Sequence, residues 1–329
     1  MENVYTKSGA LARRIYFGAT LIFESLYALF RTRVLNDGGT FLEIDLPYTI
    51  DSEILLVTPN AFKVGKLYSA KPTNGTGDFT VDRNSTATYV GQDGLIKTAL
   101  ANVPRIDWGT GVPVILRELQ RTNLLAYSED FTKSYWNKTD ITITPNTHIA
   151  PNGSLTASTF DVISIKESIR QNTPTTVIGN TVYTFSFYVK NIDIAGVSLS
   201  VYDASNVGNI VAPTSYFSQI NTSEWVRITR TFTTPVNCTS IWVYTLRDSG
   251  FIGSINFWGI QLEQGTEASS YIPTNGTTVT RLEDDISVPT PAGVTSITET
   301  IDGVEQTPIT TIPATYSLPV GNINKVTML

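Results

Sequence analysis

Residues 181–190 read TVYTFSFYVK, and this stretch decides the fold class. Every second residue is apolar, so Tyr183, Phe185, Phe187 and Val189 share one face of an extended chain while polar side chains share the other. A period of two is typical of a strand with one buried face. The stretch therefore predicts a sheet whose apolar side must be covered.

Three stretches further along the chain repeat this pattern. They read GVSLSVYD at 196–203, EWVRITRTF at 224–232 and TSIWVYTL at 239–246. Several half-buried antiparallel strands at this spacing need a second sheet to cover them, which predicts a β-sandwich of the jelly-roll type over residues 121–288. The side chains that fall on the apolar phase, or in the apolar stretch near 257, give the expected core: Phe185, Phe187, Ile228, Phe232, Val243, Phe257 and Trp258.

The composition of the 329 residues excludes several classes of protein. Lys and Arg total 23 against 29 Asp and Glu, a net charge of -6, so we expect no nucleic-acid partner. One Cys and one His cannot form a disulfide or supply the about four ligands of a zinc site. Cys238 and His148 have no nucleophile or base partner beside them, and we expect both to be uninvolved in chemistry.

Residues 10–35, ALARRIYFGATLIFESLYALFRTRVL, contain no Pro and space their apolar residues by three and four. This spacing predicts a helix, and residues 1–38 are interpreted as an N-terminal anchor and oligomerisation segment. The apolar run contains Glu24 and is shorter than the roughly 20 residues of a membrane span, so no span is expected. The expected oligomer and anchor residues are Ile15, Ala19, Ile22, Leu26, Leu29, Phe17, Phe23, Tyr27 and Phe30.

Two shorter segments flank the predicted sandwich. Residues 39–120 contain apolar runs of four to seven residues separated by Gly, Asn and Pro, which predicts a small β-domain. Residues 289–329 are interpreted as a short β appendage. Within it, Asp302-Gly303 between β-branched residues predicts a two-residue hairpin turn, and NKVTML predicts a last strand.

No catalytic motif is present in the sequence, and we expect that the protein is not an enzyme. Glycosidases need only two carboxylates at a suitable separation, so a glycan-cleaving activity through residues such as Glu263, Glu267, Asp284 and Asp285 stays an alternative. The acids around Arg281–Asp285 could instead hold a structural Ca²⁺, although a solvated charged run is the favoured interpretation. No other cofactor and no other metal is expected.

The aromatic residues are the better candidates for binding. A sugar ring stacks its apolar face on an exposed aromatic side chain. Trp242 and Tyr244 lie out of phase with the core residues of their strand, as does Tyr202, and Trp136 lies in the polar stretch SYWNK. These four are the predicted glycan-binding residues. The alternative is that their strands are buried on both faces, and Trp225 and Trp258 are interpreted as structural.

Several stretches resemble a module of tailed-phage virion proteins. They are RTNLLAYSEDFTKSYWNK, APNGSLTAS, YTFSFYVK, EWVRITRTFT and NFWGIQLEQGTEASSYIPTNGTTVTR, in that order along residues 121–281. Their order and spacing are similar to the jelly-roll domain, related to family 4/9 carbohydrate-binding modules, of phage tail and fibre proteins. Residues 66–108 resemble the small domain that precedes this module, including in crAss-like phages.

This resemblance implies a structural virion protein, a head or tail fibre that is assembled in the host bacterial cytoplasm and attaches to host-surface glycans. The absence of a signal peptide agrees with that origin. The implied partners are further copies of the chain, with a trimer expected from the fibre resemblance, and other virion proteins such as capsid, portal or tail. A glycan-cleaving tail spike and a bacterial surface adhesin are the alternative functions.

Overall fold

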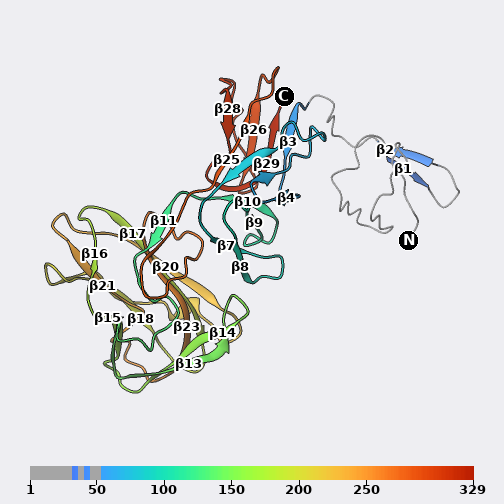
Figure 1. Ribbon diagram of the computed structural model, residues 1–329. Coiled ribbons are helices and arrows are strands. Elements are labelled where there is room, and N and C mark those ends of the chain that lie inside the picture. The colour runs from blue at the N-terminus through green and yellow to red at the C-terminus, as the bar shows by residue number, and fades with distance from the viewer. Residues whose placement is uncertain (1–31, 36–40, 45–52) are drawn as a thin grey trace. The chain divides into compact units, whose positions relative to one another are not determined.

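The computed structural model describes residues 32–35, 41–44 and 53–329 of the chain (Figure 1). The described residues are mainly β, as the sequence predicts, and their only helical element is the 3-10 turn Phe217–Gln219. They form two compact units. One unit is Val81–Asp285, and the other combines described residues up to Thr80 with Ile286–Leu329. The latter unit therefore combines two segments that are far apart in the sequence.

The unit Val81–Asp285 is a β-sandwich with a five-stranded antiparallel sheet in the order β13-β14-β23-β17-β20. These strands are β13 (Ile141–Ile149), β14 (Leu155–Val162), β23 (Gly253–Gln264), β17 (Val182–Asn191) and β20 (Val226–Thr233). Opposite it lie a four-stranded sheet in the order β16-β21-β18-β19 and a three-stranded sheet in the order β12-β15-β22. Their strands are β16 (Thr175–Thr176), β21 (Ser240–Tyr244), β18 (Ser198–Asp203), β19 (Gly208–Ser215), β12 (Trp136–Thr139), β15 (Ser168–Gln171) and β22 (Leu246–Arg247).

Three short antiparallel strand pairs complete this unit. They are β7 (Ala87–Val90) with β8 (Ile96–Ala99), β9 (Ile106–Asp107) with β10 (Val114–Arg117), and β11 (Arg121–Asn123) with β24 (Val279–Arg281). The last pair joins the start of the predicted jelly roll to its end, because Arg121 lies opposite Arg281.

The core of the sandwich follows the alternation read from the sequence. Along β17, Tyr183, Phe185, Phe187 and Val189 are all buried in one cluster with side chains from the opposite sheet. All seven predicted core residues are buried, which confirms the strand phases. Trp258 is buried in a separate, smaller cluster with Tyr271, Ala150 and Ala157. Burying a side chain of this kind contributes about 1.5–3 kcal/mol, so each buried aromatic residue is a substantial part of the stability of the unit.

The other unit contains two further sheets. One has the order β28-β25-β6-β5-β4, and the other the order β27-β26-β29 with β3 paired to β29. The predicted hairpin is confirmed: Ile301 pairs with Val304, and both turn residues have positive φ, 51° at Asp302 and 77° at Gly303. The strands are β3 (Leu55–Val57), β4 (Phe62–Lys63), β5 (Lys66–Leu67), β6 (Phe79–Asp82), β25 (Asp285–Pro289), β26 (Ile297–Ile301), β27 (Val304–Glu305), β28 (Thr315–Ser317) and β29 (Gly321–Met328).

The predicted N-terminal helix falls mostly outside the described residues. Its last four residues form strand β1 (Thr32–Leu35), which pairs with β2 (Phe41–Ile44), so the helix prediction is wrong at that end. Thr32 and Val34 are β-branched and suit an extended chain. The predicted oligomer and anchor residues, from Ile15 to Phe30, lie outside the described residues. The described part of the chain has no helix that could span a membrane.

Five charged side chains inside Val81–Asp285 form what we call the buried arginine network. Arg83, Arg105, Arg281 and Asp284 are buried, and the side chain of Glu118 is 15% exposed. Arg83 Nη1 lies 2.6 Å from Asp284 Oδ1, and Arg105 donates to the other oxygen of Asp284. Glu118 Oε2 lies 2.7 Å from Arg105 Nη1 and 3.5 Å from Arg281 Nη2. Asp284 is fully buried, so the interpretation of Arg281–Asp285 as a solvated charged run is wrong at this residue. Its two oxygens bind guanidinium groups rather than a Ca²⁺.

Candidate functional site

The outer side of the sheet that contains β21 carries a row of aromatic side chains. Ile241 and Val243 point into the core and are buried, so Trp242 and Tyr244 project to the opposite face. In the register of β18 with β21, Tyr202 lies opposite Trp242. Two neighbouring strands therefore present aromatic rings on the same surface.

Two arginines lie over these rings. The Arg170 guanidinium is 4.2 Å from the centroid of the Trp242 ring, and Arg247 is 5.2 Å from Tyr202 and 4.6 Å from Tyr244. The rings of Tyr202 and Trp242 stack on each other, with centroids 6.1 Å apart and planes 29° apart. We call these five residues the arginine–aromatic face. Cation–π contacts of this kind contribute about 0.5–2 kcal/mol each and hold the guanidinium groups in place.

The stacking order follows from the strand order. Strand β21 pairs with β16 on one side and with β18 on the other. Strand β22, which follows β21 in the chain, pairs with β15 on the same side as β16. Arg170, on β15, and Tyr202, on β18, therefore reach Trp242 from opposite sides. The indole is therefore covered by a cation and has a phenol ring beside it.

The hydrogen bonds of the two arginines leave donors free. Arg247 Nη1 donates to Ser200 Oγ at 3.0 Å and to Asn209 Oδ1 at 3.1 Å, and its Nε is 3.8 Å from a carboxylate oxygen of Asp248. Arg170 Nη1 donates only to backbone oxygens, that of Gln171 at 2.8 Å and that of Asn172 at 3.4 Å. Among the described residues Arg170 has no carboxylate within ion-pair distance. This face is thus locally cationic.

The four predicted glycan-binding residues fall into two groups. Trp242 and Tyr202 are half-buried and lie side by side on the face. Tyr244 is only 7% exposed, and burial raises the pKa of its hydroxyl although Arg247 and Arg170 lower it. Trp136 is 2% exposed and packs against Phe131 and Tyr135. Its side chain is on the core side of β12, so the expectation that a sugar could reach it is wrong. The burial of Tyr244 likewise contradicts its predicted role as an exposed sugar-binding ring.

Two residues of the face, Arg170 and Arg247, were not among the predicted site residues. Each lies next to a buried residue of its own short strand, Ile169 in SIRQ and Leu246 in the pair Leu246–Arg247. Their outward phase could have been read from these strands. The strand pairing that brings β15 and β22 alongside Trp242 could not be predicted from the sequence.

The acids named as alternative catalytic residues lie in different environments. Glu263 is buried and accepts hydrogen bonds from the backbone N and the hydroxyl of Ser269, at 2.9 and 2.6 Å. Asp284 belongs to the buried arginine network, and Glu267 and Asp285 are exposed. His148 is exposed on β13, and the Cys238 thiol is buried. No cluster of three or more metal-ligating side chains occurs in the described part of the chain.

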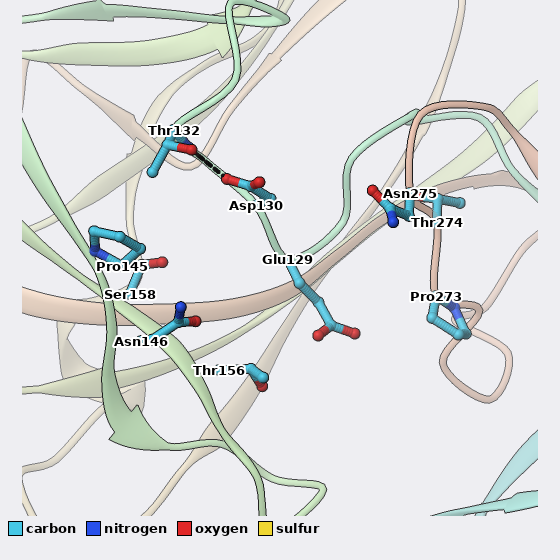
Figure 2. A pocket seen from close by; sticks show the side chains of 10 residues that line it. All are labelled: Glu129, Asp130, Thr132, Pro145, Asn146, Thr156, Ser158, Pro273, Thr274 and Asn275. Carbon is cyan, nitrogen blue, oxygen red and sulfur yellow. Dashed lines mark hydrogen bonds between the residues drawn. The ribbon is translucent and has the colours of Figure 1, made fainter.

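A concave surface lies elsewhere in the same unit (Figure 2). It is a cavity of about 490 Å³ into which the Glu129 side chain projects. Burial raises the pKa of Glu129, against the hydrogen bond that its Oε1 accepts from Tyr271 at 2.9 Å. The lining is polar and acidic: Glu129, Asp130, Thr132, Pro145, Asn146, Thr156, Ser158, Pro273, Thr274 and Asn275. We call it the Glu129 pocket.

No protein-family model matches the chain, and no curated protein matches it. Solved structures that are similar in part include a xylan-binding CBM22-1 domain of Paenibacillus barcinonensis Xyn10C, with 13% identity, a TM-score of 0.32, and coverage of 46% of this chain and 98% of that domain. The CBM22-1–GH10 modules of Clostridium thermocellum xylanase 10B give 15% identity and a TM-score of 0.33 over 44% of this chain and 28% of that one.

A phage protein is also among the similar structures. The enzymatically active domain of tailspike protein 4 of bacteriophage CBA120 has 14% identity and a TM-score of 0.35, over 44% of this chain and 21% of that one. The chain therefore spans only about a quarter of the length of the xylanase and tailspike structures that it matches.

Proposed function

We propose that this protein is a non-enzymatic structural component of a tailed-phage virion, a head or tail fibre that binds host-surface glycans through its arginine–aromatic face. The sequence resemblance along residues 121–281 supports the virion assignment. One observation carries the binding assignment: Trp242 and Tyr202, half-buried and stacked, share an outer sheet surface with two guanidinium groups.

The chemistry of this surface suits a polyhydroxylated ligand. Ring edges and CH groups of an aromatic stack contact the apolar parts of a sugar, and the free N–H donors of Arg170 and Arg247 can bind its oxygen atoms. The face is a surface of the sheet rather than a closed cavity, which suits internal units of a long chain. A single shallow contact of this kind is weak, and several copies in one fibre would raise the avidity.

The proposed assembly is a homotrimer that forms in the host cytoplasm and attaches to another virion protein through residues 1–38. Light scattering of the full-length protein should then give about three times the mass of one chain. Deletion of residues 1–35 should prevent incorporation into particles. A stable monomer of the full-length chain would contradict the trimer.

The binding proposal is tested with Trp242→Ala in affinity electrophoresis through host polysaccharide. We expect at least a tenfold loss of retardation, because the variant removes the ring that both Arg170 and Tyr202 contact. The matched control is Trp225→Ala, since Trp225 is also half-buried but lies beside β20, where its Nε1 donates to the Ile149 carbonyl oxygen. Equal retardation of the wild type and Trp242→Ala, with an unchanged melting temperature, would reject the site.

A further inference from the structure

We infer that the ligand of the arginine–aromatic face is an acidic polysaccharide, whose carboxylate or sulfate groups are bound by Arg170 and Arg247. This inference rests on the proposed glycan-binding function and narrows it to one chemical class. Four observations lead to it: the coverage of the indole, the state of the two guanidinium groups, the charge around them, and the contrast with the Glu129 pocket.

The coverage of Trp242 argues against a neutral sugar that stacks face to face. Such a sugar needs a bare ring surface. Here the Arg170 guanidinium lies 4.2 Å from the ring centroid, and the Tyr202 ring lies beside the indole with its centroid 6.1 Å away. A neutral sugar would have to displace a guanidinium group from its cation–π contact, whereas an anionic sugar can bind that group where it stands.

The guanidinium groups are held in a geometry that suits oxyanions. Arg247 is fixed by Ser200, Asn209 and two rings, and Arg170 by two backbone oxygens and the indole. A planar guanidinium that is already ordered loses little side-chain entropy when it donates two parallel hydrogen bonds to a carboxylate or sulfate. Both arginines are half-buried, so their charges are less screened than those of extended surface side chains.

The surrounding charge favours an anion as well. The chain has a net charge of -6, so a cationic face stands out against an acidic background. Among the described residues, the nearest acid to either guanidinium is Asp248, 3.8 Å from Arg247 Nε, and its side chain is 45% exposed. The buried Asp203 carboxylate is occupied by Ser205 and Asn206, which donate to its oxygens at 2.6 and 2.9 Å. Arg170 therefore carries the less compensated charge.

The Glu129 pocket has the opposite character. Glu129 and Asp130 both line it, and no Lys or Arg is among its lining residues. An acidic ligand would be repelled there. The arginine–aromatic face therefore fits a polyanion and the Glu129 pocket does not, and substitutions in one surface leave the residues of the other unchanged.

The test uses the full-length protein with polygalacturonate and with the same polymer after reduction of its carboxyl groups, in affinity electrophoresis at low and high salt. Dextran sulfate and dextran form a second pair, which separates sulfate from carboxylate recognition. We expect the acidic polymer of at least one pair to retard the protein. The neutral polymer of that pair should retard it at least tenfold less, and high salt should reduce the retardation by the acidic polymer.

Arg170→Gln and Arg247→Gln should each weaken retardation by the acidic polymer at least tenfold, and Arg170→Lys should restore only part of it because a Lys cannot donate bidentately. The control is Arg230→Gln, an exposed arginine on β20. Equal binding of acidic and neutral polymers, sensitive to Trp242→Ala but not to the two Gln variants, would overturn the inference and leave the proposed function intact.

Two other outcomes are decisive in different ways. Absence of retardation by every polymer, including native host polysaccharide, would reject the proposed function itself. Binding of an oligo(dT) strand as tight as that of the acidic polymer, with the same loss in the Gln variants, would show a general polyanion surface and overturn the assignment to glycans.

Discussion

The arginines of the buried network and those of the arginine–aromatic face differ in what balances their charge. Arg83 and Arg105 both donate to the buried carboxylate of Asp284, and Glu118 binds Arg105 and Arg281. In the face, the rings of Trp242, Tyr202 and Tyr244 lie against the guanidinium groups. Carboxylates neutralise an arginine, but aromatic rings only hold it.

This difference separates a structural role from a binding role. Residues of the network lie far apart in the sequence, up to 201 positions for Arg83 and Asp284, so their bonds join the segment after Val81 to the end of the sandwich. Arginines that are paired and fully buried have nothing to offer a ligand. Arginines that lie on rings at the surface keep both their charge and free donors.

Asp284→Ala should cause the largest loss of stability. Removing this carboxylate leaves Arg83 as a buried charge without its carboxylate partner and takes away one of the two carboxylates that bind Arg105, which typically costs about 3–5 kcal/mol. Urea unfolding followed by tryptophan fluorescence measures the change. The matched control is the adjacent and exposed Asp285→Ala, for which less than about 0.5 kcal/mol is expected. Equal stability of the two variants would show that the network does not hold the unit together.

Acid should weaken the same network through Glu118. Burial would raise the pKa of Glu118, but Arg105, Arg281 and hydrogen bonds from Ser270 outweigh it and lower the pKa from 4.5 to about 2. A carboxyl group with a lowered pKa in the folded state contributes stability above its unfolded pKa and loses it as the pH falls toward the folded value. The contribution, on the order of 3 kcal/mol, should therefore disappear between about pH 4.5 and 2.

The variant Glu118→Gln isolates this contribution from that of the other acids. Its free energy of unfolding should already be low at pH 6, and the difference from the wild type should shrink as the pH falls toward 2. Urea titrations at pH 6, 4 and 3 measure that difference. A difference that stays constant over this range would contradict the role given to Glu118.

The sequence predicted what local alternation determines and missed what long-range pairing creates. The phase of Phe185, Phe187 and Val243 follows from a period of two, and the turn at Asp302-Gly303 from the backbone freedom of these two residues. Trp136 was misjudged because its polar neighbours in SYWNK conceal a core-facing strand position.

The network and the face depend on pairings between distant strands. Arg105, Asp284 and Arg281 carry no local sign that they are buried together, and the charged run around 284 resembles a solvated one. Trp242, Tyr202 and Tyr244 could be identified because each lies out of phase with its own strand. Arg170 and Arg247 could not be joined to them without the order of β15, β22, β21 and β18.

The smallest effect on stability is expected for Arg170→Gln. The variant loses one cation–π contact and the hydrogen bonds to two backbone oxygens, and water can replace these hydrogen bonds at this half-buried position. The free energy of unfolding should therefore fall by about 1 kcal/mol or less. Urea unfolding at pH 7 gives the value, to be compared with Asp284→Ala in the same buffer. Because Arg170 has no carboxylate partner among the described residues, its removal leaves no buried carboxylate unpaired. A loss as large as that of Asp284→Ala would place Arg170 with the structural arginines and remove the contrast on which its binding role depends.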